Sequence, residues 1–274
     1  MRQAVYFFKE EDFQQVENLQ LLIEVSDEFY GFAAFDAKEK KVKAWVLYQT
    51  VATLSISEAE LLQIKKQQAW LNFRYTKTTI VDCDARNTLL PQVLYSEGNN
   101  ACQIMYGKKP ADIILKDYLP AADAVNIFSV ADEMYHLFQA NFENTIWCHK
   151  QSLLLKQSAS NNASLTITIK FHSIFIAAAQ HNKWVLLQRK QYQTPEDVLY
   201  HILNTIKHLG FDEKKTTVLL EGMAEENSAL AALLRQYLYI MQWNTNLEFI
   251  YPLEASSISK HTLALTDRLL TCVL

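Results

Sequence analysis

Acidic side chains stand near the predicted ends of strands in the first third of the chain. Glu24 and Asp27 lie near the first predicted strand, Asp82 and Asp84 lie on a later one, and Glu60 lies on a predicted helix between them. Carboxylates in this setting could hold two divalent metal ions at a phosphodiester, which is the chemistry of a metal-dependent nuclease. Nucleases usually present a basic surface, whereas this chain has a formal net charge of −4. The favoured interpretation is therefore acids at turns, caps and strand edges.

Histidines and cysteines show no spacing typical of a metal site. His201 and His208 lie seven residues apart on one predicted helix, where two exposed histidines are the favoured interpretation. No P-loop, dinucleotide fingerprint or Gly-x-Ser-x-Gly motif occurs. We therefore predict no catalytic residue and no metal site. The cysteines form no C-x-x-C pair, which indicates reduced thiols in or near the core: Cys83, Cys102, Cys148 and Cys272.

The elements that would position functional side chains are clearest between residues 165 and 239. Apolar residues alternate with threonine in the first run, which predicts a strand with one buried face. Two more apolar runs predict an antiparallel meander. A helix follows, with Thr194 as N-cap and Pro195 at the first helical position, and then a fourth strand and a covering helix. The four strands are predicted at residues 165–169, 174–179, 183–187 and 217–220.

The same order of elements recurs between residues 21 and 84. Three apolar runs predict a second meander, Ser57 and Glu60 have the spacing of a capping box, and a further strand follows. The polar run 157–164 is the predicted boundary between the halves. These strands are predicted at residues 21–25, 30–35, 42–48 and 78–84. The two subdomains are predicted at residues 1–157, which include an N-terminal extension, and 158–274. A late strand is predicted at residues 247–251 and a terminal helix at 263–273.

This plan resembles the actin-like ATPase superfamily, which includes sugar kinases, heat-shock chaperones and the platform proteins of pilus assembly and type II secretion. The resemblance covers residues 21–84 and 165–250. It implies an α/β fold of duplicated ribonuclease H-like type, with two mixed sheets that each contain a three-strand antiparallel meander and crossover helices. The chain also resembles an uncharacterised bacterial family of unknown function.

The candidate site departs from the superfamily pattern. Actin-like ATPases are expected to hold phosphates at two hairpins, where an Asp binds the metal and glycines let backbone N–H groups approach. The first hairpin here, residues 25–31, has Asp27 but two bulky aromatic residues, and the second, residues 170–173, has neither acid nor glycine. Among only five glycines, Gly222 alone resembles part of the adenosine-side glycine pair. A bound nucleotide would therefore contact Asp27, Asp82 and Gly222.

We therefore expect a non-catalytic binding or scaffold protein that has lost its phosphate-binding loops and whose partner is another protein. One alternative is a nucleotide-binding ATPase or kinase with atypical phosphate contacts. The other is a metal-dependent nuclease that uses Glu24, Asp82 and Asp84. The net charge gives no general reason to expect nucleic acid as a partner. No apolar stretch approaches the roughly 20 residues that span a bilayer, and charges at residues 9–12 argue against a signal peptide, so we expect a cytoplasmic protein. We also expect no cofactor.

Overall fold

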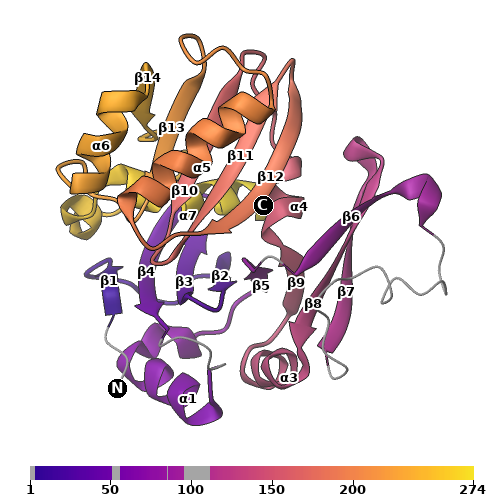
Figure 1. Ribbon diagram of the computed structural model, residues 1–274. Coiled ribbons are helices and arrows are strands. Elements are labelled where there is room, and N and C mark those ends of the chain that lie inside the picture. The colour runs from indigo at the N-terminus through magenta and orange to yellow at the C-terminus, as the bar shows by residue number, and fades with distance from the viewer. Residues whose placement is uncertain (1–3, 51–55, 85, 96–111) are drawn as a thin grey trace. The chain divides into compact units, whose positions relative to one another are not determined.

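A computed structural model of the chain describes residues 4–50, 56–84, 86–95 and 112–274 (Figure 1). Its residues form two compact units. The first comprises Met1–Lys156, Phe249–Ser257 and Leu270–Leu274, and the second Gln157–Glu248 and Ile258–Leu269. The division into two ribonuclease H-like subdomains at residue 157 stays a prediction. Of the four cysteines, Cys102 lies outside the described residues, Cys83 is buried, and Cys148 and Cys272 are partly buried.

The first unit is built on a six-stranded mixed sheet. Its middle is the predicted meander, in which β2 pairs with β3 and β3 with β4, all antiparallel. Strand β5 runs parallel to β2, and β9 runs parallel to β5. The order is β1-β4-β3-β2-β5-β9. The strands are β1 (Ala4–Lys9), β2 (Leu19–Val25), β3 (Phe29–Asp36), β4 (Lys41–Gln49), β5 (Lys77–Asp82) and β9 (Thr145–His149).

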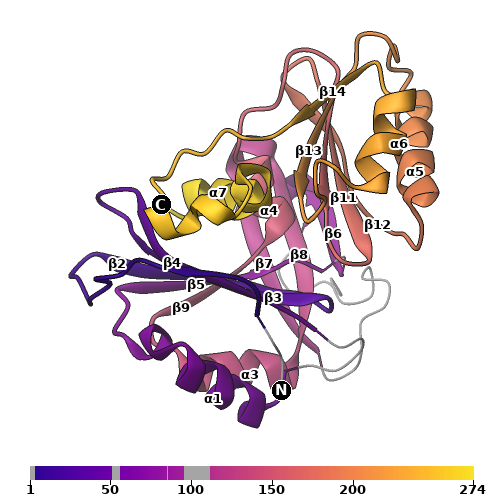
Figure 2. The same cartoon turned by 90° about the vertical axis from the view of Figure 1, so that its left-hand side faces the viewer.

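Two helices cover one face of this sheet, as Figure 2 shows. Helix α1 (Glu58–Gln67) begins after Ser57, whose predicted capping box with Glu60 is present. Helix α3 (Asp132–Asn141) leads into β9. Apolar side chains of both helices pack against alternate residues of β2, because successive strand residues point to opposite faces. A short helix, α4 (Lys150–Leu155), follows β9 directly.

A three-stranded antiparallel sheet in the order β6-β8-β7 is inserted between β5 and α3. Its strands are β6 (Asn87–Pro91), β7 (Asp112–Leu119) and β8 (Ala124–Ala131). The short 3-10 helices are η1 (Ala69–Asn72), η2 (Gln92–Leu94), η3 (Pro120–Ala122) and η4 (Leu253–Ser257). In the described part of the chain, no helix is long and apolar enough to cross a membrane.

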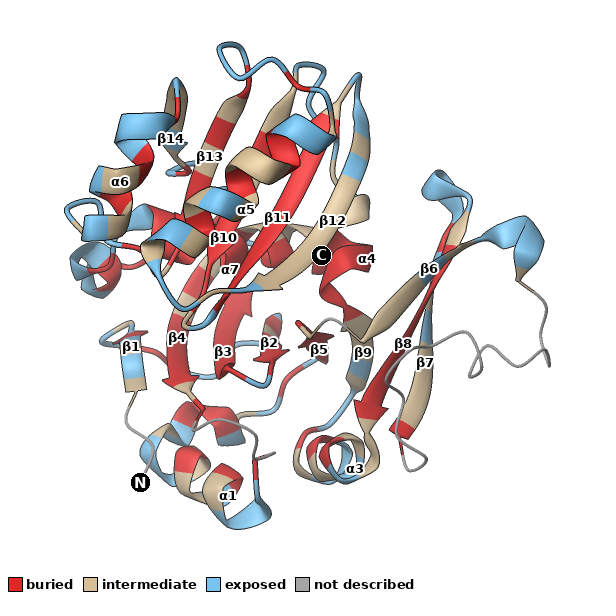
Figure 3. Cartoon of the chain, in the orientation of Figure 1, coloured by how far each residue is buried: buried red, intermediate tan, exposed pale blue. Residues whose placement is uncertain are grey.

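The second unit repeats the strand order of the first. Its sheet runs β12-β11-β10-β13-β14, with an antiparallel meander followed by two parallel strands, as in β4-β3-β2-β5-β9. Helices α5 and α6 pack on its core, and β11, an inner strand of the sheet, is buried along most of its length (Figure 3). The elements are β10 (Ser164–Ile169), β11 (Ser173–Gln180), β12 (Lys183–Gln191), α5 (Pro195–His208), β13 (Thr217–Gly222), α6 (Ala229–Tyr237), β14 (Ile240–Trp243) and, at the end of the chain, α7 (Lys260–Val273).

Two predictions about strands are wrong. The late strand at residues 247–251 does not form, since only Ile250 makes an isolated bridge, to Lys41. The sheet position beside β13 is taken instead by β14, whose four residues give too short an apolar signal to be recognised in the sequence. Strand β5 ends at Asp82 rather than at Asp84. Asp84 therefore lies in the loop that follows β5, where its side chain can reach a neighbouring turn.

Candidate functional site

The turn between β2 and β3 is capped by a carboxylate from elsewhere in the chain. Ser26, Asp27 and Glu28 form the turn, which is closed by a hydrogen bond from the Ser26 amide to the Phe29 carbonyl at 3.0 Å. Oδ1 of Asp84 accepts the backbone N–H of Asp27 at 3.0 Å and lies 3.1 Å from the Ser26 hydroxyl. That hydroxyl is also 3.1 Å from Oδ1 of Asp27. The donors of the first hairpin are thus used within the protein.

Strand register brings these residues together. Val25 at the end of β2 lies opposite Asp82 at the end of β5, and Asp82 lies opposite His149 at the end of β9. The amide of Asp84 donates to Oδ1 of Asp82 at 3.0 Å. In open α/β sheets, ligands bind at the carboxyl ends of parallel strands, and all three strands end here. We call the following residues the strand-end cluster: Ser26, Asp27, Asp82, Asp84, His149 and Lys150.

Asp82 is a strongly perturbed acid of the strand-end cluster. Its side chain is 1 % exposed, and burial, followed by the negative charge of Asp84, raises its pKa to about 8. The hydrogen bond from the Asp84 amide and the charges of Arg86 and Lys150 oppose this shift. Oδ2 of Asp82 has no hydrogen-bond partner among the described residues. A carboxyl group that is mostly protonated at pH 7 is a poor ligand for Mg²⁺, which binds carboxylate oxygens.

His149 has a structural role in the strand-end cluster. Its Nδ1 accepts the backbone N–H of Gln151 at 3.2 Å, which caps α4, so the proton is assigned to Nε2, 2.9 Å from the carbonyl of Asp84. Burial lowers the pKa of this imidazole to about 3, so it stays neutral. Lys150 is also buried, with Nζ 3.5 Å from the carbonyl of Cys83. The sequence interpretation missed both residues because β9, which positions them, is a five-residue strand without clear alternation.

The acids of the nuclease hypothesis do not converge. Asp82 and Asp84 are neighbours, but Glu24 precedes Val25, and alternation along β2 turns it to the other face of the sheet. Glu60 accepts the backbone N–H of Ser57 at 3.0 Å and serves as a helix cap. Among the residues that the structure describes, no group of three or more His, Cys, Asp or Glu side chains is arranged to hold a metal ion.

The second hairpin contains no glycine whose backbone N–H could approach a phosphate. It joins β10 to β11, and Tyr192 binds it twice, with its amide to the carbonyl of His172 at 3.0 Å and its hydroxyl to the carbonyl of Lys170 at 2.7 Å. Gly222 ends β13 in the same unit with a φ of +96°, and a Cβ there would lie 2.2 Å from the carbonyl oxygen of Ile169. Packing between two strands therefore requires this glycine whether or not a ligand binds.

A buried ionic network stabilises the second unit. Glu221, which is fully buried in β13, accepts the hydroxyl of Thr168 at 2.6 Å and the side-chain amide of Asn244 at 2.8 Å. Arg268 on α7 completes the network with Nη2 at 2.9 Å from Oε1 of Glu221. Because each oxygen of the carboxylate has a donor, the charge is compensated. A lone acid in an apolar run gave no sequence signal for this arrangement.

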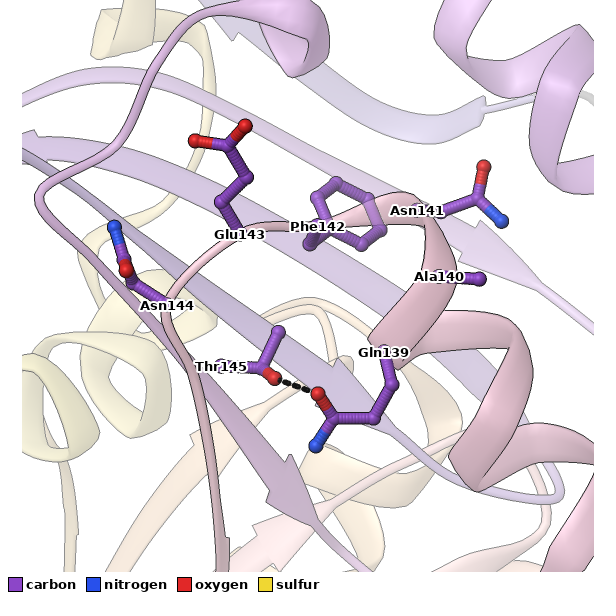
Figure 4. Close-up of a pocket in the computed structure, with 7 residues that line it drawn as sticks. All are labelled: Gln139, Ala140, Asn141, Phe142, Glu143, Asn144 and Thr145. Atoms are coloured by element: carbon purple, nitrogen blue, oxygen red, sulfur yellow. Dashed lines mark hydrogen bonds between the residues drawn. The ribbon is translucent and has the colours of Figure 1, made fainter.

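A depression of about 610 Å³ lies elsewhere in the first unit, at the C-terminal end of α3 (Figure 4). It is lined by residues 139–145, and the side chains of Gln139 and Thr145 are hydrogen-bonded across it. Thr145 is the first residue of β9, whereas His149 of the strand-end cluster is the last. The depression is therefore at the opposite end of the parallel strands from the cluster.

Comparisons with known proteins identify the fold. A Bacteroides thetaiotaomicron protein with an actin-like ATPase fold and unknown function is 16% identical, with a TM-score of 0.76 over 94% of this chain and 100% of that one. A chain of the PilM-PilN type IV pilus biogenesis complex is 12% identical, with a TM-score of 0.61 over 95% and 100%. The ethanolamine utilization protein EutJ from Carboxydothermus hydrogenoformans is 8% identical, with a TM-score of 0.53 over 94% and 90%.

No curated protein matches the sequence. At these low identities the solved structures show the fold alone, and they agree with the duplicated strand order described above. The family described as "Protein of unknown function (DUF3822)" matches residues 9–240. The chain therefore belongs to the DUF3822 family and has the fold of the actin-like ATPases.

Proposed function

We propose that this chain is a non-catalytic, cytoplasmic binding protein that uses an actin-like fold to hold another protein rather than to turn over a nucleotide. The observation that carries the proposal is the contact between Asp84 and the first hairpin. The Asp27 amide and the Ser26 hydroxyl are both within hydrogen-bond distance of one carboxylate oxygen of the protein itself. A phosphate brought to the same donors would meet that carboxylate and be repelled by it.

The nucleotide and divalent metal that the fold family implies do not fit the residues present. Asp82 is buried with a pKa of about 8 and so carries little charge at pH 7. The second hairpin contains no glycine, and its carbonyls at Lys170 and His172 are bound by Tyr192. Gly222 is accounted for by the approach of Ile169. These features support loss of the phosphate-binding loops.

A protein partner is the part of the proposal that draws on structural similarity. One similar structure is a complex of two proteins, PilM and PilN, in type IV pilus biogenesis. By analogy, an actin-like fold can bind another protein.

The proposal is tested by thermal unfolding of the purified protein with and without excess ATP and magnesium. A ligand at 100 times its dissociation constant adds about 2.7 kcal/mol to the free energy of unfolding if it binds only the native state. We expect no change in midpoint. A rise that disappears in Asp27→Ala or Asp82→Ala would contradict the proposal and favour an ATPase or kinase. Magnesium-dependent cleavage of a nucleic acid, lost in Asp84→Ala, would instead favour the nuclease.

A further inference from the structure

We propose that the outer edge of β12 is a docking site for an extended, acidic segment of another protein, which pairs with β12 as an additional strand of the second unit's sheet. The inference rests on the proposed function, because it names the surface and the partner chemistry of a chain that holds another protein. Strand β12 lies at one edge of its sheet, beside β11 (Figure 1). In the part of the chain that the structure describes, no strand pairs with its outer side. An edge strand offers a row of backbone N–H and C=O groups to another chain.

The first unit shows the corresponding edge occupied by a strand. Strands β4 and β12 are each the third strand of a meander and hold the same place in the repeated strand order. The outer side of β4 pairs antiparallel with β1, and the backbone N–H of Glu10, directly after β1, donates to the carbonyl of Lys43 at 2.8 Å. This place in the sheet therefore accepts an extended antiparallel strand from outside the meander, which is the form that we assign to the partner.

The hydrogen-bond ladder shows which backbone groups of β12 point outward. Tyr192, directly after β12, donates its backbone N–H to the carbonyl opposite it, just before β11, at 3.0 Å. In an antiparallel ladder, residues that bond to the neighbouring strand alternate with residues whose N–H and C=O groups point away from it. By the register with β11, Gln188 therefore bonds to β11, whereas the N–H and C=O groups of Leu187 point to the outer edge. The carbonyl of Gln191 belongs to the same outward series, and Nε2 of His201 on α5 lies 3.2 Å from it.

The charge of this edge favours an acidic partner. No Asp or Glu occurs between Glu143 and Glu196, although the whole chain has 30 acidic residues. Strand β12 itself carries Lys183, Arg189 and Lys190. Among the described residues, neither Lys183 nor Lys190 takes part in an ion pair. An acidic segment is attracted to these side chains, whereas a second copy of β12 would bring like charges together.

The side chains of β12 set the pattern expected of the partner. Leu186 packs against the core of the second unit, and its neighbour Val185 is 45 % exposed. Lys183 and Lys190 lie toward the two ends of the strand. Cross-strand pairs are stabilising when both side chains are apolar and β-branched or aromatic, or when their charges are opposite. The partner segment should therefore carry apolar residues in its middle and acidic residues toward both ends.

The test is an NMR titration of the full chain with the blocked peptide Glu-Glu-Val-Thr-Val-Thr-Val-Glu-Glu. At a peptide concentration about ten times the dissociation constant, hydrogen exchange of the Leu187 amide should slow about tenfold, because the peptide must dissociate before this amide exchanges. The ¹H shift of the same amide should move downfield, and by more than that of Gln188, whose N–H points toward β11. A Leu187 amide that the acidic peptide leaves unchanged overturns the inference.

Charge variants test the chemistry of the partner. The same peptide with Lys in place of Glu should bind about tenfold more weakly or worse. Lys190→Glu should weaken binding of the acidic peptide about fivefold, whereas Lys214→Glu, the same change at an exposed turn of the second unit, should have little effect. Equal binding of the two peptides overturns the inference. A Leu187 amide that responds to concentrating the protein alone would assign the edge to a second copy, and one that responds only to oligothymidylate would assign it to nucleic acid.

Two variants separate the backbone of Leu187 from its side chain. Leu187→Pro removes the outward N–H, and Leu187→Ala keeps it while truncating the side chain. Proline is tolerated where an edge N–H faces away from the sheet, so peptide binding should be lost in Leu187→Pro and kept in Leu187→Ala. Equal binding by both contradicts strand addition, and if Leu187→Pro does not fold, the titration of the native chain decides. Stabilisation by ATP contradicts the proposed function, whereas absent peptide binding by a chain that ATP does not stabilise contradicts only docking at β12.

Discussion

Replacing Asp82 by Asn should change how the stability of the protein depends on pH. Burial, reinforced by the charge of Asp84, raises the pKa of Asp82 from 3.8 to about 8. Below about pH 4 the carboxyl group is protonated in both the folded and the unfolded chain and imposes no penalty. Between about pH 4 and pH 8 the unfolded chain releases a proton that the folded chain retains. The free energy of unfolding should therefore fall by about 1.4 kcal/mol per pH unit in this window.

The magnitude follows from the size of the shift. A difference of about 4 pKa units corresponds to an upper limit of about 6 kcal/mol above pH 8. Asn is neutral in both states and keeps an oxygen for the Asp84 amide, so Asp82→Asn should lack this slope. Urea unfolding of both proteins from pH 5 to pH 8 should show the native chain losing about 4 kcal/mol relative to the variant.

Two outcomes decide whether this reasoning holds. A difference in the free energy of unfolding that stays constant between pH 5 and pH 8 would refute it, because Asp82 would then titrate alike in both states. The variant Asp84→Asn provides the matched control. Since the charge of Asp84 helps to raise the pKa of Asp82, neutralising it should move the sloping region toward lower pH. A sloping region that lies at the same pH in Asp84→Asn would show that the charge of Asp84 does not contribute to the shift.

Three further predictions concern other buried groups. Gly222→Ala should lower the free energy of unfolding in urea by about 3 kcal/mol or more, because φ at this residue is positive and the new Cβ would meet a carbonyl of β10. Gly210→Ala, which has a positive φ but open space around the Cβ, should cost only about 1 kcal/mol. Equal costs would contradict the role of the close approach. Burial lowers the pKa of His149 to about 3, so its contribution to the stability of the protein should be lost only as the pH falls below about 6.5, the pKa of histidine in the unfolded chain. The imidazole ¹H shifts of His149 should therefore stay constant in the native protein from pH 8 to pH 5. A titration midpoint near pH 6.5 in the native protein would show that the imidazole is accessible. Arg268→Ala should lower the free energy of unfolding by about 3 kcal/mol or more, because it leaves the buried carboxylate of Glu221 without its ion-pair partner. Adding Glu221→Gln to this variant should recover part of the loss. If it does not, the loss is due to packing.

Local signals predicted most of the elements that form both halves of the fold. Thr194 accepts the backbone N–H of Asp197 and caps α5, as its spacing to Pro195 indicated. Ser57 caps α1 in the same way. These interactions join residues within one helical turn, so the residue types at neighbouring positions are sufficient to reveal them. The repeated order of meander, helix and strand then indicated the actin-like plan, which the similar structures confirm.

The candidate site was only partly predictable. Asp27 and Asp82 were named from the sequence and do lie at adjacent strand ends, with Asp84 beside them. The role of each could not be read from the chain, because Asp84 caps a turn 57 residues away and His149 reaches it from 65 residues away. No local pattern encodes such a contact.

The sequence by itself determined where the two meanders and their first crossover helices form, how those helices are capped and in what order these elements alternate. The tertiary structure decided which acids meet, which are neutral and which glycine is required. Glu24 and Asp82 illustrate the difference, since both stand at predicted strand ends and yet point to opposite faces once β2 and β5 are paired. The physical reason is that periodicity and capping act over a few residues, whereas strand register and burial depend on residues distant in the chain, and register and burial set the charge and the contacts of a site.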